Sequence, residues 1–582
     1  MNLFEQLRQN VLDAIAERQQ SGDLPADLDL SRVTAEPPRD EGHGDAATNA
    51  ALVLAKPAKM PPMAIAEMLA TDLARLDRVE SADIAKPGFV NLRLDPDVWR
   101  DQVRLALEAG DDYGRADLGR SEPINVEYCS ANPTGPLHVG HGRGTVFGDA
   151  LANLLEKMGY AVTREYYIND GGIQIDHLAR SVHHRYLEAL GAAPAEPPEG
   201  MYPGDYLIPL GKKIAEDDRD RWQYAAEVDW MPVFRTRAVA AMMTLIKDDL
   251  AALGVHHDVF TSEAAMVSEG NVDEAMKLLE DMGLIYEGTL PPPKGKPSED
   301  WEPVPLLLFK ATDYGDDIDR PLRSSNGELT YFAKDLACHF DKFRRGARQL
   351  IDVFGADHGG YVKRMQAAVK AMSQGGSTLD VRLCQLVNLM DGGQPIRMSK
   401  RAGRIVTLRD LVDEVGKDVV RFIMLTRKND APLDFDLAEV TEKSRDNPVF
   451  YVQYAHARIR SVERHAAEMG LPTDRASLSD ADLSLLNDPG ELALIRQLAQ
   501  YPRILASAAT HREPHRIAFY LGDLAGSFHA LWNQGKEQSE LRFLLPDAIP
   551  TSKARLALIG AVRIAIASGL DVIGVEPVEE MT

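Results

Sequence analysis

Two histidines three residues apart form the most distinctive chemical pattern in the sequence. His138, Gly140 and His141 lie in the string HVGH, between an apolar segment at 124–128 and a segment of helical periodicity at 139–159. At the start of a helix, imidazoles at positions i and i+3 share one side of the first turn, where exposed N–H groups and the positive end of the helix dipole favour phosphate. Gly140 leaves room for a flat base. The pattern predicts a nucleoside triphosphate site, with a solvated or metal-binding histidine pair as the alternative.

A basic loop is the second candidate for phosphate chemistry. The segment RMSKRAGR, which begins at Arg397, places four cations within eight residues of an acidic protein. On its own, such a loop is most simply interpreted as a solvated surface segment. Together with the histidine pair it predicts a clamp on a leaving pyrophosphate, with Lys400 as the main cation.

The elements around the histidines indicate a nucleotide-binding fold. The strings INVEY at 124–128 and AVTREYYI at 161–168 have the pattern of strands, and the predicted helix lies between them. This order favours a doubly wound parallel sheet, whose ligands bind beyond the carboxyl ends of the strands. We therefore expect an α/β, Rossmann-type catalytic domain over 118–410. Strand-like runs at 304–309 and 349–359 would resume it after a mostly helical insertion at about 175–300.

Two further domains are expected in a chain of 582 residues. Residues 1–117 combine an amphipathic helix at the start with a short alternating strand at 89–94, which predicts a small α+β domain. A stretch dense in Gly, Asp and Pro at 110–123 marks its end. Long helical patterns dominate 411–582 and predict an all-helical C-terminal domain.

Composition restricts the partners and the compartment. The net charge of -24 lacks the basic field of an unspecific nucleic-acid binder, so any contact with nucleic acid must be local. The three cysteines, Cys129, Cys338 and Cys384, lie far apart, which supports neither a disulfide framework nor a thiolate zinc site. No signal peptide is visible, and no apolar run approaches the roughly 18 residues of a membrane span. A cytoplasmic protein without a bound metal or a membrane is expected.

The combination of HVGH with a distant RMSK resembles the two signature sequences of class I aminoacyl-tRNA synthetases. The flanking sequence resembles the arginyl-tRNA synthetase family in particular. Matching strings occur nearly end to end: GDAATNAALVLAK, VEYCSANPTGPLHVGHGRGTVFGD, YPGDYL, LGVHHDVFTSE, GELTYFAKDLACH, GADHGGY, RMSKRAG, NPVFYVQYAHARI and VIGVEPVEEM.

The resemblance implies a two-step reaction in which arginine and ATP form arginyl-adenylate and pyrophosphate, and the arginyl group then moves to the 3′ end of tRNA(Arg). His138, His141 and Lys400 would be catalytic, and Mg²⁺ would accompany ATP. Gly140, Arg397, Met398 and Ser399 would bind ATP, although Arg397 stands where the family has a lysine. The C-terminal domain would bind the anticodon and the N-terminal domain the tRNA elbow. A monomer is expected.

The amino-acid pocket follows from the same resemblance. A guanidinium is a planar fork of five donors, which carboxylates accept in pairs. Glu127 and Asp335 match positions that the family uses, and Tyr331 lies four residues before Asp335. Ser130, Asn132 and His358 complete the expected substrate contacts, with Asp357 as an alternative to His358. From spacing alone, Glu127 could equally be a strand-end carboxylate paired to an arginine, and Tyr331 and Asn132 are more simply structural.

Three alternative functions remain open from the sequence. These are a class I synthetase for another amino acid, an HxGH nucleotidyltransferase that acts on a metabolite, and a catalytically silent tRNA-binding relative. The last would be expected to lack a signature, and the second has no use for two further domains. Tyr451 and Tyr454 could stack on RNA bases, but tyrosines at helical spacing are more often core, so no single tRNA contact is predicted.

Overall fold

The computed structural model of the protein describes residues 2–38, 40–193, 196–197, 200–291, 304–396, 406–442 and 447–581. The chain forms two compact units. One holds Asp117–Lys443 with Ile573–Val575, and the other combines Met1–Ala116, Ser444–Val572 and Glu576–Thr582. The division between Ala116 and Asp117 lies in the Gly- and Asp-rich stretch at 110–123. Residue 410, where the second boundary was expected, lies inside the unit that holds Asp117–Lys443.

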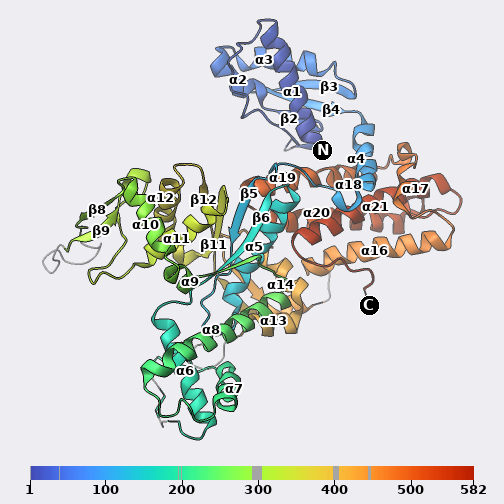
Figure 1. Ribbon diagram of the computed structural model, residues 1–582. Coiled ribbons are helices and arrows are strands. Elements are labelled where there is room, and N and C mark those ends of the chain that lie inside the picture. The colour runs from blue at the N-terminus through green and yellow to red at the C-terminus, as the bar shows by residue number, and fades with distance from the viewer. Residues whose placement is uncertain are drawn as a thin grey trace. The chain divides into compact units, whose positions relative to one another are not determined.

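A five-stranded parallel sheet forms the centre of the unit that carries HVGH (Figure 1). Its order is β12-β11-β5-β6-β7, with bounds β5 Pro123–Glu127, β6 Ala161–Ile168, β7 Val259–Ser262, β11 Gln349–Gly355 and β12 Thr378–Cys384. Every neighbouring pair runs parallel. From β5 the chain proceeds outward through β6 and β7, then returns to β11 on the other side of β5. The strand order therefore reverses between β5 and β11, where such sheets bind ligands.

The helix that follows β5 packs closely on the sheet. This helix, α5 (Val139–Lys157), contacts β5, β6 and β11. A Cβ atom at Gly148 would lie 2.3 Å from the Tyr128 side chain, so the glycine permits the close approach of α5 to the end of β5. The predicted strand–loop–helix–strand order is thus present, with β6 at the predicted bounds.

The segment between β6 and β11 is more varied than a helical insertion. It contains α6 (Ile173–Ala189), α7 (Ile208–Asp218), α8 (Glu227–Ala252), α9 (Glu263–Ser268), α10 (Asn271–Asp281) and α11 (Tyr331–Arg344). Within the expected range of 175–300, β7 joins the parallel sheet. The strand expected at 304–309 instead forms β9 (Leu306–Phe309) of a separate antiparallel sheet with β8 (Ile285–Gly288) and β10 (Arg320–Pro321). Apolar character alone did not reveal which sheet would take this strand.

Residues 387–441 belong to the same unit. After α12 (Val362–Met372) and β12, the strands β13 (Val387–Asp391), β14 (Gln394–Pro395) and β15 (Leu433–Asp436) form a small sheet. Helices α13 (Leu408–Val415), α14 (Lys417–Met424) and α15 (Leu437–Thr441) accompany it. Because β15 pairs in parallel with β13, the chain beyond 410 remains part of this unit up to α15.

The other unit joins the two ends of the chain. Its N-terminal part has an antiparallel sheet of order β1-β2-β4-β3 and four helices. The bounds are α1 Leu3–Gln20, β1 Ala35–Glu36, β2 Ala46–Thr48, α2 Ala50–Ala58, α3 Pro62–Leu73, β3 Val79–Ala85, β4 Phe89–Leu94 and α4 Pro96–Ala109. Helix α4 packs against the C-terminal helices α18 (Pro489–Ala499) and α21 (Ile549–Val572), and the Arg104 guanidinium donates to the Ser479 carbonyl at 3.1 Å.

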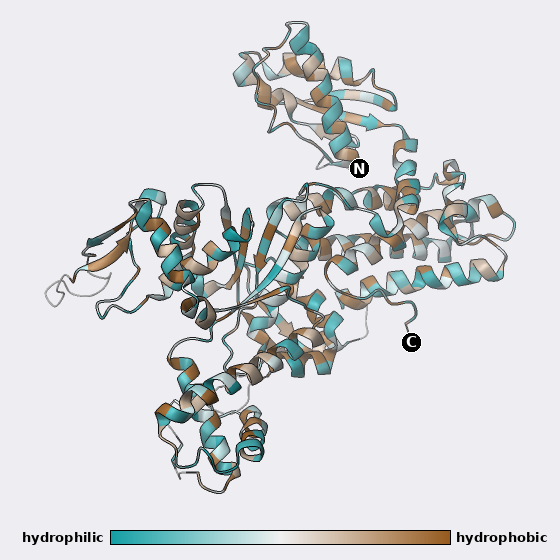
Figure 2. Ribbon diagram, viewed as in Figure 1, coloured by the Kyte–Doolittle hydropathy of each residue, from teal (hydrophilic) through white to brown (hydrophobic). Residues whose placement is uncertain are grey.

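The C-terminal part of this unit consists of helices in the described residues. They are α16 Pro448–Glu468, α17 Arg475–Ser479, α18 Pro489–Ala499, α19 Tyr501–His511, α20 His515–Glu537 and α21 Ile549–Val572. Helix α16 buries Val452, Ala455, Ile459 and Val462, at spacings of three and four residues, and carries hydrophilic residues between them (Figure 2). This is the pattern of a helix with one face in a core.

The predicted fold class is confirmed. The protein is a multidomain α/β protein with an N-terminal α+β part, a doubly wound catalytic fold and a C-terminal helical part. None of the described helices is both long enough and apolar enough to cross a membrane.

Candidate active site

A cavity of about 600 Å³ opens at the carboxyl ends of β5 and β11. It thus lies at the reversal of strand order where the fold predicts a ligand. All the described residues that the sequence predicts as catalytic, ATP-binding or substrate-binding line this cavity: Glu127, Ser130, Asn132, His138, Gly140, His141, Tyr331, Asp335 and His358, together with Asp357. Segments more than 200 residues apart in the sequence therefore meet in one site.

The two histidines form a stacked pair at the start of α5. His138 is the N-cap residue, and its Nδ1 accepts from the Gly140 N–H at 3.1 Å, while His141 Nδ1 accepts from the His138 N–H at 3.2 Å. The ring centroids lie 3.7 Å apart. A ring nitrogen that accepts a hydrogen bond carries no proton, so both neutral rings hold their proton on Nε2. The pair thereby places two Nε2–H groups beside a helix N-terminus.

Gly140 is required by this ring geometry. A Cβ atom at position 140 would lie 2.9 Å from both Cε1 and Nδ1 of His138. Such a distance is shorter than any ordinary carbon contact, so a side chain would push the imidazole out of its place over the first turn. The glycine that the sequence suggested as an opening for a base also makes room for the histidine itself.

The basic signature segment lies outside the described residues. Arg397, Met398, Ser399 and Lys400 therefore have no described position, but the residues on both sides of the segment are anchored. Before it, Ile396 N–H donates to the Leu389 carbonyl at 2.9 Å. After it, Leu408 N–H donates to the Leu137 carbonyl at 2.8 Å, and Thr407 pairs with His138 in an isolated antiparallel bridge. Thr407 and Leu408, which follow the segment, are thus joined to the backbone of Leu137 and His138.

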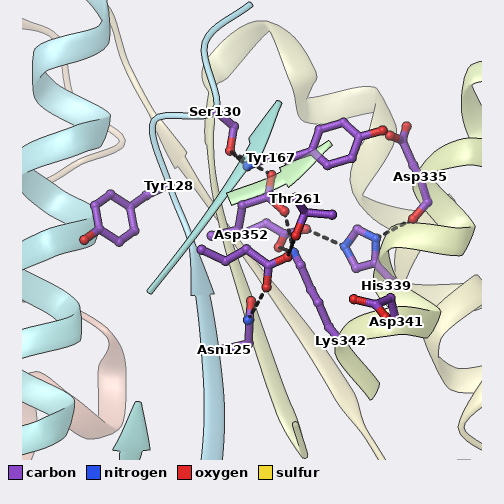
Figure 3. A network of polar contacts seen from close by, with 12 residues as sticks. Asn125, Tyr128, Ser130, Tyr167, Thr261, Asp335, His339, Asp341, Lys342 and Asp352 are labelled. Carbon is purple, nitrogen blue, oxygen red and sulfur yellow. Dashed lines mark hydrogen bonds and ion pairs between the residues drawn. The ribbon is translucent and has the colours of Figure 1, made fainter. Parts of the chain in front are cut away.

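A buried cluster of four charged side chains lies under the cavity, between α11 and the strands β5 and β11 (Figure 3). The ammonium of Lys342 contacts Glu127 and lies 3.3 Å from Asp352 Oδ1. His339 Nε2 lies 2.8 Å from Asp352 Oδ2, and its Nδ1 lies 2.7 Å from the Asp335 carbonyl oxygen. A carbonyl oxygen only accepts, so Nδ1 donates, and a second proton on Nε2 makes the ring an imidazolium facing the carboxylate.

The cluster is electrically balanced. Burial by itself would raise the pKa of Asp352, but Lys342 and His339 hold it at about 2. Burial lowers the pKa of His339, and Asp352 more than offsets this, so the pKa is raised overall. Two cations therefore face the two carboxylates of Asp352 and Glu127. Glu127 is thus paired to a lysine, not to the arginine that spacing had suggested, and it has little charge left for a ligand.

Asp335 is different from these carboxylates. It projects from the first turns of α11 and accepts a hydrogen bond from the Tyr361 hydroxyl, and among the described residues it forms no ion pair. Burial raises its pKa to about 7, and the nearby carboxylates of Glu127 and Glu263 add to the rise against His339. Tyr331, one helical turn earlier, is 69% exposed and available to a ligand.

Glu263 is the carboxylate that sequence reasoning missed. It follows β7 directly and begins α9, and its side chain is buried in the cavity wall. Oε1 lies 2.7 Å from the Lys334 ammonium, and Oε2 accepts from the Tyr167 hydroxyl at 3.1 Å. Glu127 was predicted from the family resemblance. Like Glu127, Glu263 stands at the carboxyl end of a parallel strand, a signal that could have identified it, but β7 lies within the expected helical insertion.

The loop after β5 supplies the remaining polar groups. Cys129 and Ser130 have φ values of 70° and 37°, in the left-handed region that non-glycine residues rarely adopt. This turn lets the Ser130 hydroxyl donate to Glu127 Oε1 and accept from the Tyr167 N–H, both at 3.0 Å. Asn132 is exposed and donates to Gln174 Oε1 at 2.8 Å. At the far wall, the side chain of His358 is 58% exposed.

Family models match three parts of the chain. The arginyl-tRNA synthetase N-terminal domain matches residues 5–94, the catalytic domain of class I (R) tRNA synthetases matches residues 102–204, and the DALR anticodon binding domain matches residues 452–581. The three matches follow the chain in the order of the expected domains.

Relatives that match the chain over its full length are arginine–tRNA ligases. Arginine–tRNA ligases of Rhodospirillum rubrum and Ruegeria pomeroyi are 58% and 57% identical, and in each case 100% of both chains is covered. The solved structure of Thermus thermophilus arginyl-tRNA synthetase is similar in fold, with a TM-score of 0.74 at 23% identity over 100% of both chains. Another amino acid specificity and an HxGH nucleotidyltransferase are accordingly not favoured. Because these relatives are 58% and 57% identical to the chain over its full length, and because three family models match it, the chain belongs to the arginine–tRNA ligase family.

Proposed function

We propose that the cavity at β5 and β11 is where this enzyme joins arginine to ATP, before the arginyl group passes to the 3′ end of tRNA(Arg). The observation that carries the proposal is the charge balance of the cavity. Among the carboxylates that the strands, α9 and α11 contribute, Glu127 and Asp352 face Lys342 and His339, and Glu263 faces Lys334, which leaves Asp335 without a cation among the described residues. The further carboxylate of the cavity, Asp357, is exposed to solvent and lies 3.9 Å from His358 Nε2. One unbalanced negative charge matches one guanidinium.

Arginine would lie with its side chain toward α11. The guanidinium pairs with Asp335, and Glu263 at the adjacent wall accepts a further hydrogen bond from the planar fork. The exposed ring of Tyr331 covers the cationic group. The α-amino and carboxyl end extends toward Asn132 and the histidines. His358 and Asp357 line the opposite wall and remain available to the nucleotide or to the amino acid.

ATP would lie with its phosphates over the first turn of α5. The Nε2–H groups of His138 and His141 donate to phosphate oxygens, and the helix N-terminus adds its partial positive charge. Gly140 leaves a flat surface for the base. Lys400 and Ser399, with Arg397 and Met398 beside them, hold the β- and γ-phosphates. Magnesium bound with ATP offsets the charge of the phosphates.

The reaction needs no covalent bond to the enzyme. An oxygen of the arginine carboxylate attacks the α-phosphorus, and the bond from that phosphorus to the bridging oxygen of pyrophosphate breaks. Negative charge increases on the phosphoryl oxygens, where the two imidazole N–H groups stabilise it. Positioning of both substrates in one cavity and this electrostatic stabilisation supply the acceleration.

A matched pair of variants tests the arginine pocket. Asp335→Asn should raise the KM for arginine about 10- to 100-fold, the value of one charge-assisted pair, and leave the KM for ATP within about twofold. Asp341→Asn is the control, because Asp341 lies on the same helix but pairs with Arg345 at 2.8 Å away from the cavity. Pyrophosphate exchange with each amino acid, in the presence of tRNA, measures both constants. Equal changes in the two KM values would remove Asp335 from the pocket.

The remaining expectations concern the state of the enzyme in the cell. We infer that the chain acts as a monomer in the cytoplasm, with tRNA(Arg) as its only macromolecular substrate. Its acidic composition and three scattered cysteines are consistent with a reducing compartment. Sedimentation of the purified protein with and without tRNA measures the oligomeric state.

A further inference from the structure

An ion pair stands directly behind the wall of the arginine cavity. Lys334 precedes Asp335 on α11, and its ammonium lies 2.7 Å from Glu263 Oε1. The side chain of Glu263 is 3% exposed and that of Lys334 is 18% exposed. Among the described residues that line the cavity, Glu263 and Tyr167 are present and Lys334 is not. The ammonium thus pairs with a carboxylate of the cavity wall from outside the lining residues, and it lies 5.6 Å from the ring centroid of Tyr331.

Glu263 is held from three directions before any substrate binds. Lys334 contacts Oε1, the Tyr167 hydroxyl donates to Oε2, and Gly171 packs beside Oε1. A Cβ atom at Gly171 would lie 2.4 Å from that oxygen and 3.8 Å from the Lys334 nitrogen. No side chain fits at position 171 while the ion pair keeps its place.

We propose that Lys334 is a positioning residue for arginine recognition, which fixes the Glu263 carboxylate and cancels its charge. The proposal rests on the proposed function of the cavity. Glu263 and Asp335 are close enough for their charges to interact. Without Lys334 the pocket would present two unbalanced carboxylates to its ligand.

The Lys334–Glu263 ion pair explains how the pocket can recognise a guanidinium by its planar geometry and not only by its positive charge. A pocket with two unbalanced carboxylates would attract the compact ammonium of lysine through charge alone. The two like charges would also repel each other and displace the oriented acceptors that a guanidinium needs, so arginine would bind less well than in the balanced pocket. With Lys334 in place, the net charge of the pocket is satisfied by one cation, and Glu263 contributes mainly an oriented acceptor. A guanidinium can donate to Asp335 and Glu263 at the same time through its planar fork, whereas the compact ammonium of lysine spans two separate acceptors poorly.

A double-mutant cycle separates positioning from a merely structural role. Lys334→Met should raise the KM for arginine about tenfold and leave the KM for ATP within about twofold, whereas Lys334→Arg should restore most of the loss. In a Glu263→Gln background, Lys334→Met should change the arginine KM by less than about twofold, because the carboxylate that it positions is gone. In Lys334→Met, the affinity for lysine, measured as a competitive inhibitor, should increase relative to the affinity for arginine.

Gly171→Ala gives an independent perturbation that keeps both charges. It displaces Oε1 and should raise the arginine KM in the same direction, so it carries the test if Lys334→Met fails to fold, which thermal unfolding of each variant checks. The proposal is overturned if Lys334→Met has the same effect in the Glu263→Gln background, if arginine and ATP are affected equally, or if the arginine KM does not change. Failure of Asp335→Asn would instead overturn the proposed function.

Discussion

Binding of arginine should release a proton from Asp335, to a degree set by pH. Burial raises the pKa of this carboxyl to about 7, so the free enzyme holds it partly protonated in the neutral range. Only the carboxylate form pairs with a guanidinium, and the bound cation lowers the pKa. The pKa of Asp335 is thus raised in the free enzyme and lower in the complex with arginine. The affinity for arginine should therefore reach its maximum above pH 7 and decrease as the pH falls below 7.

The number of protons released and the change in arginine affinity both follow from the pKa of Asp335. With a pKa of about 7, the carboxyl is roughly nine-tenths protonated at pH 6, half at pH 7 and one-tenth at pH 8. Each bound arginine should therefore release about 0.9, 0.5 and 0.1 proton at these three values, and the affinity should be about tenfold weaker at pH 6 than at pH 8. Calorimetry of arginine binding in buffers of different ionisation enthalpy measures the affinity and the protons together.

Two controls tie this behaviour to Asp335. Tyr361→Phe removes the hydroxyl that donates to the carboxylate, which should raise the pKa further and move the midpoint to higher pH. Citrulline, with a neutral urea group in place of the guanidinium, should release no proton. An arginine affinity that stays constant from about pH 6 to pH 8 without proton release would refute the reasoning, and so would a midpoint that moves to lower pH in Tyr361→Phe.

Three further outcomes are expected. His141→Ala should lower kcat for adenylate formation about 100-fold and leave the KM for arginine unchanged, whereas His141→Gln, which keeps an N–H donor, should retain more activity. Pyrophosphate exchange in the presence of tRNA measures both constants. A change in the KM for arginine without a change in kcat would argue against a phosphate contact of His141. Gly140→Ala should lower kcat about tenfold in the same assay, because its Cβ would lie 2.9 Å from the His138 ring. Lys342→Met should reduce the free energy of unfolding by about 3–5 kcal/mol in denaturant titrations, because it leaves the buried Glu127 without its cation and Asp352 with His339 alone. Adding Glu127→Gln should restore part of the stability, and an unchanged stability of Lys342→Met would show that the cluster tolerates the unbalanced charge.

Local chemistry could be predicted from the sequence because its determinants are local. Strand β5, the loop after it and α5 follow one another directly, so the residues that place His138 and His141 at a helix N-terminus are all near neighbours in the chain. In the same way, Tyr331 and Asp335 share a face because four residues make about one helical turn. The two signature strings and the long helices of the C-terminal part needed no tertiary information.

Only the tertiary structure decided which charges remain available to a ligand. Glu127 and Lys342 are 215 residues apart, and their contact depends on β11 and α11 packing beside β5. No periodicity in the sequence predicts such a pairing, because a charge is balanced or unbalanced only through neighbours brought from elsewhere in the chain. For the same reason the sequence named Glu127 and missed Glu263, since β7 is recognisable as a fifth parallel strand only once it pairs with β6. The spacing of residues in the chain thus predicted a site for phosphate chemistry, and packing across the sheet determined which carboxylates have a cation beside them.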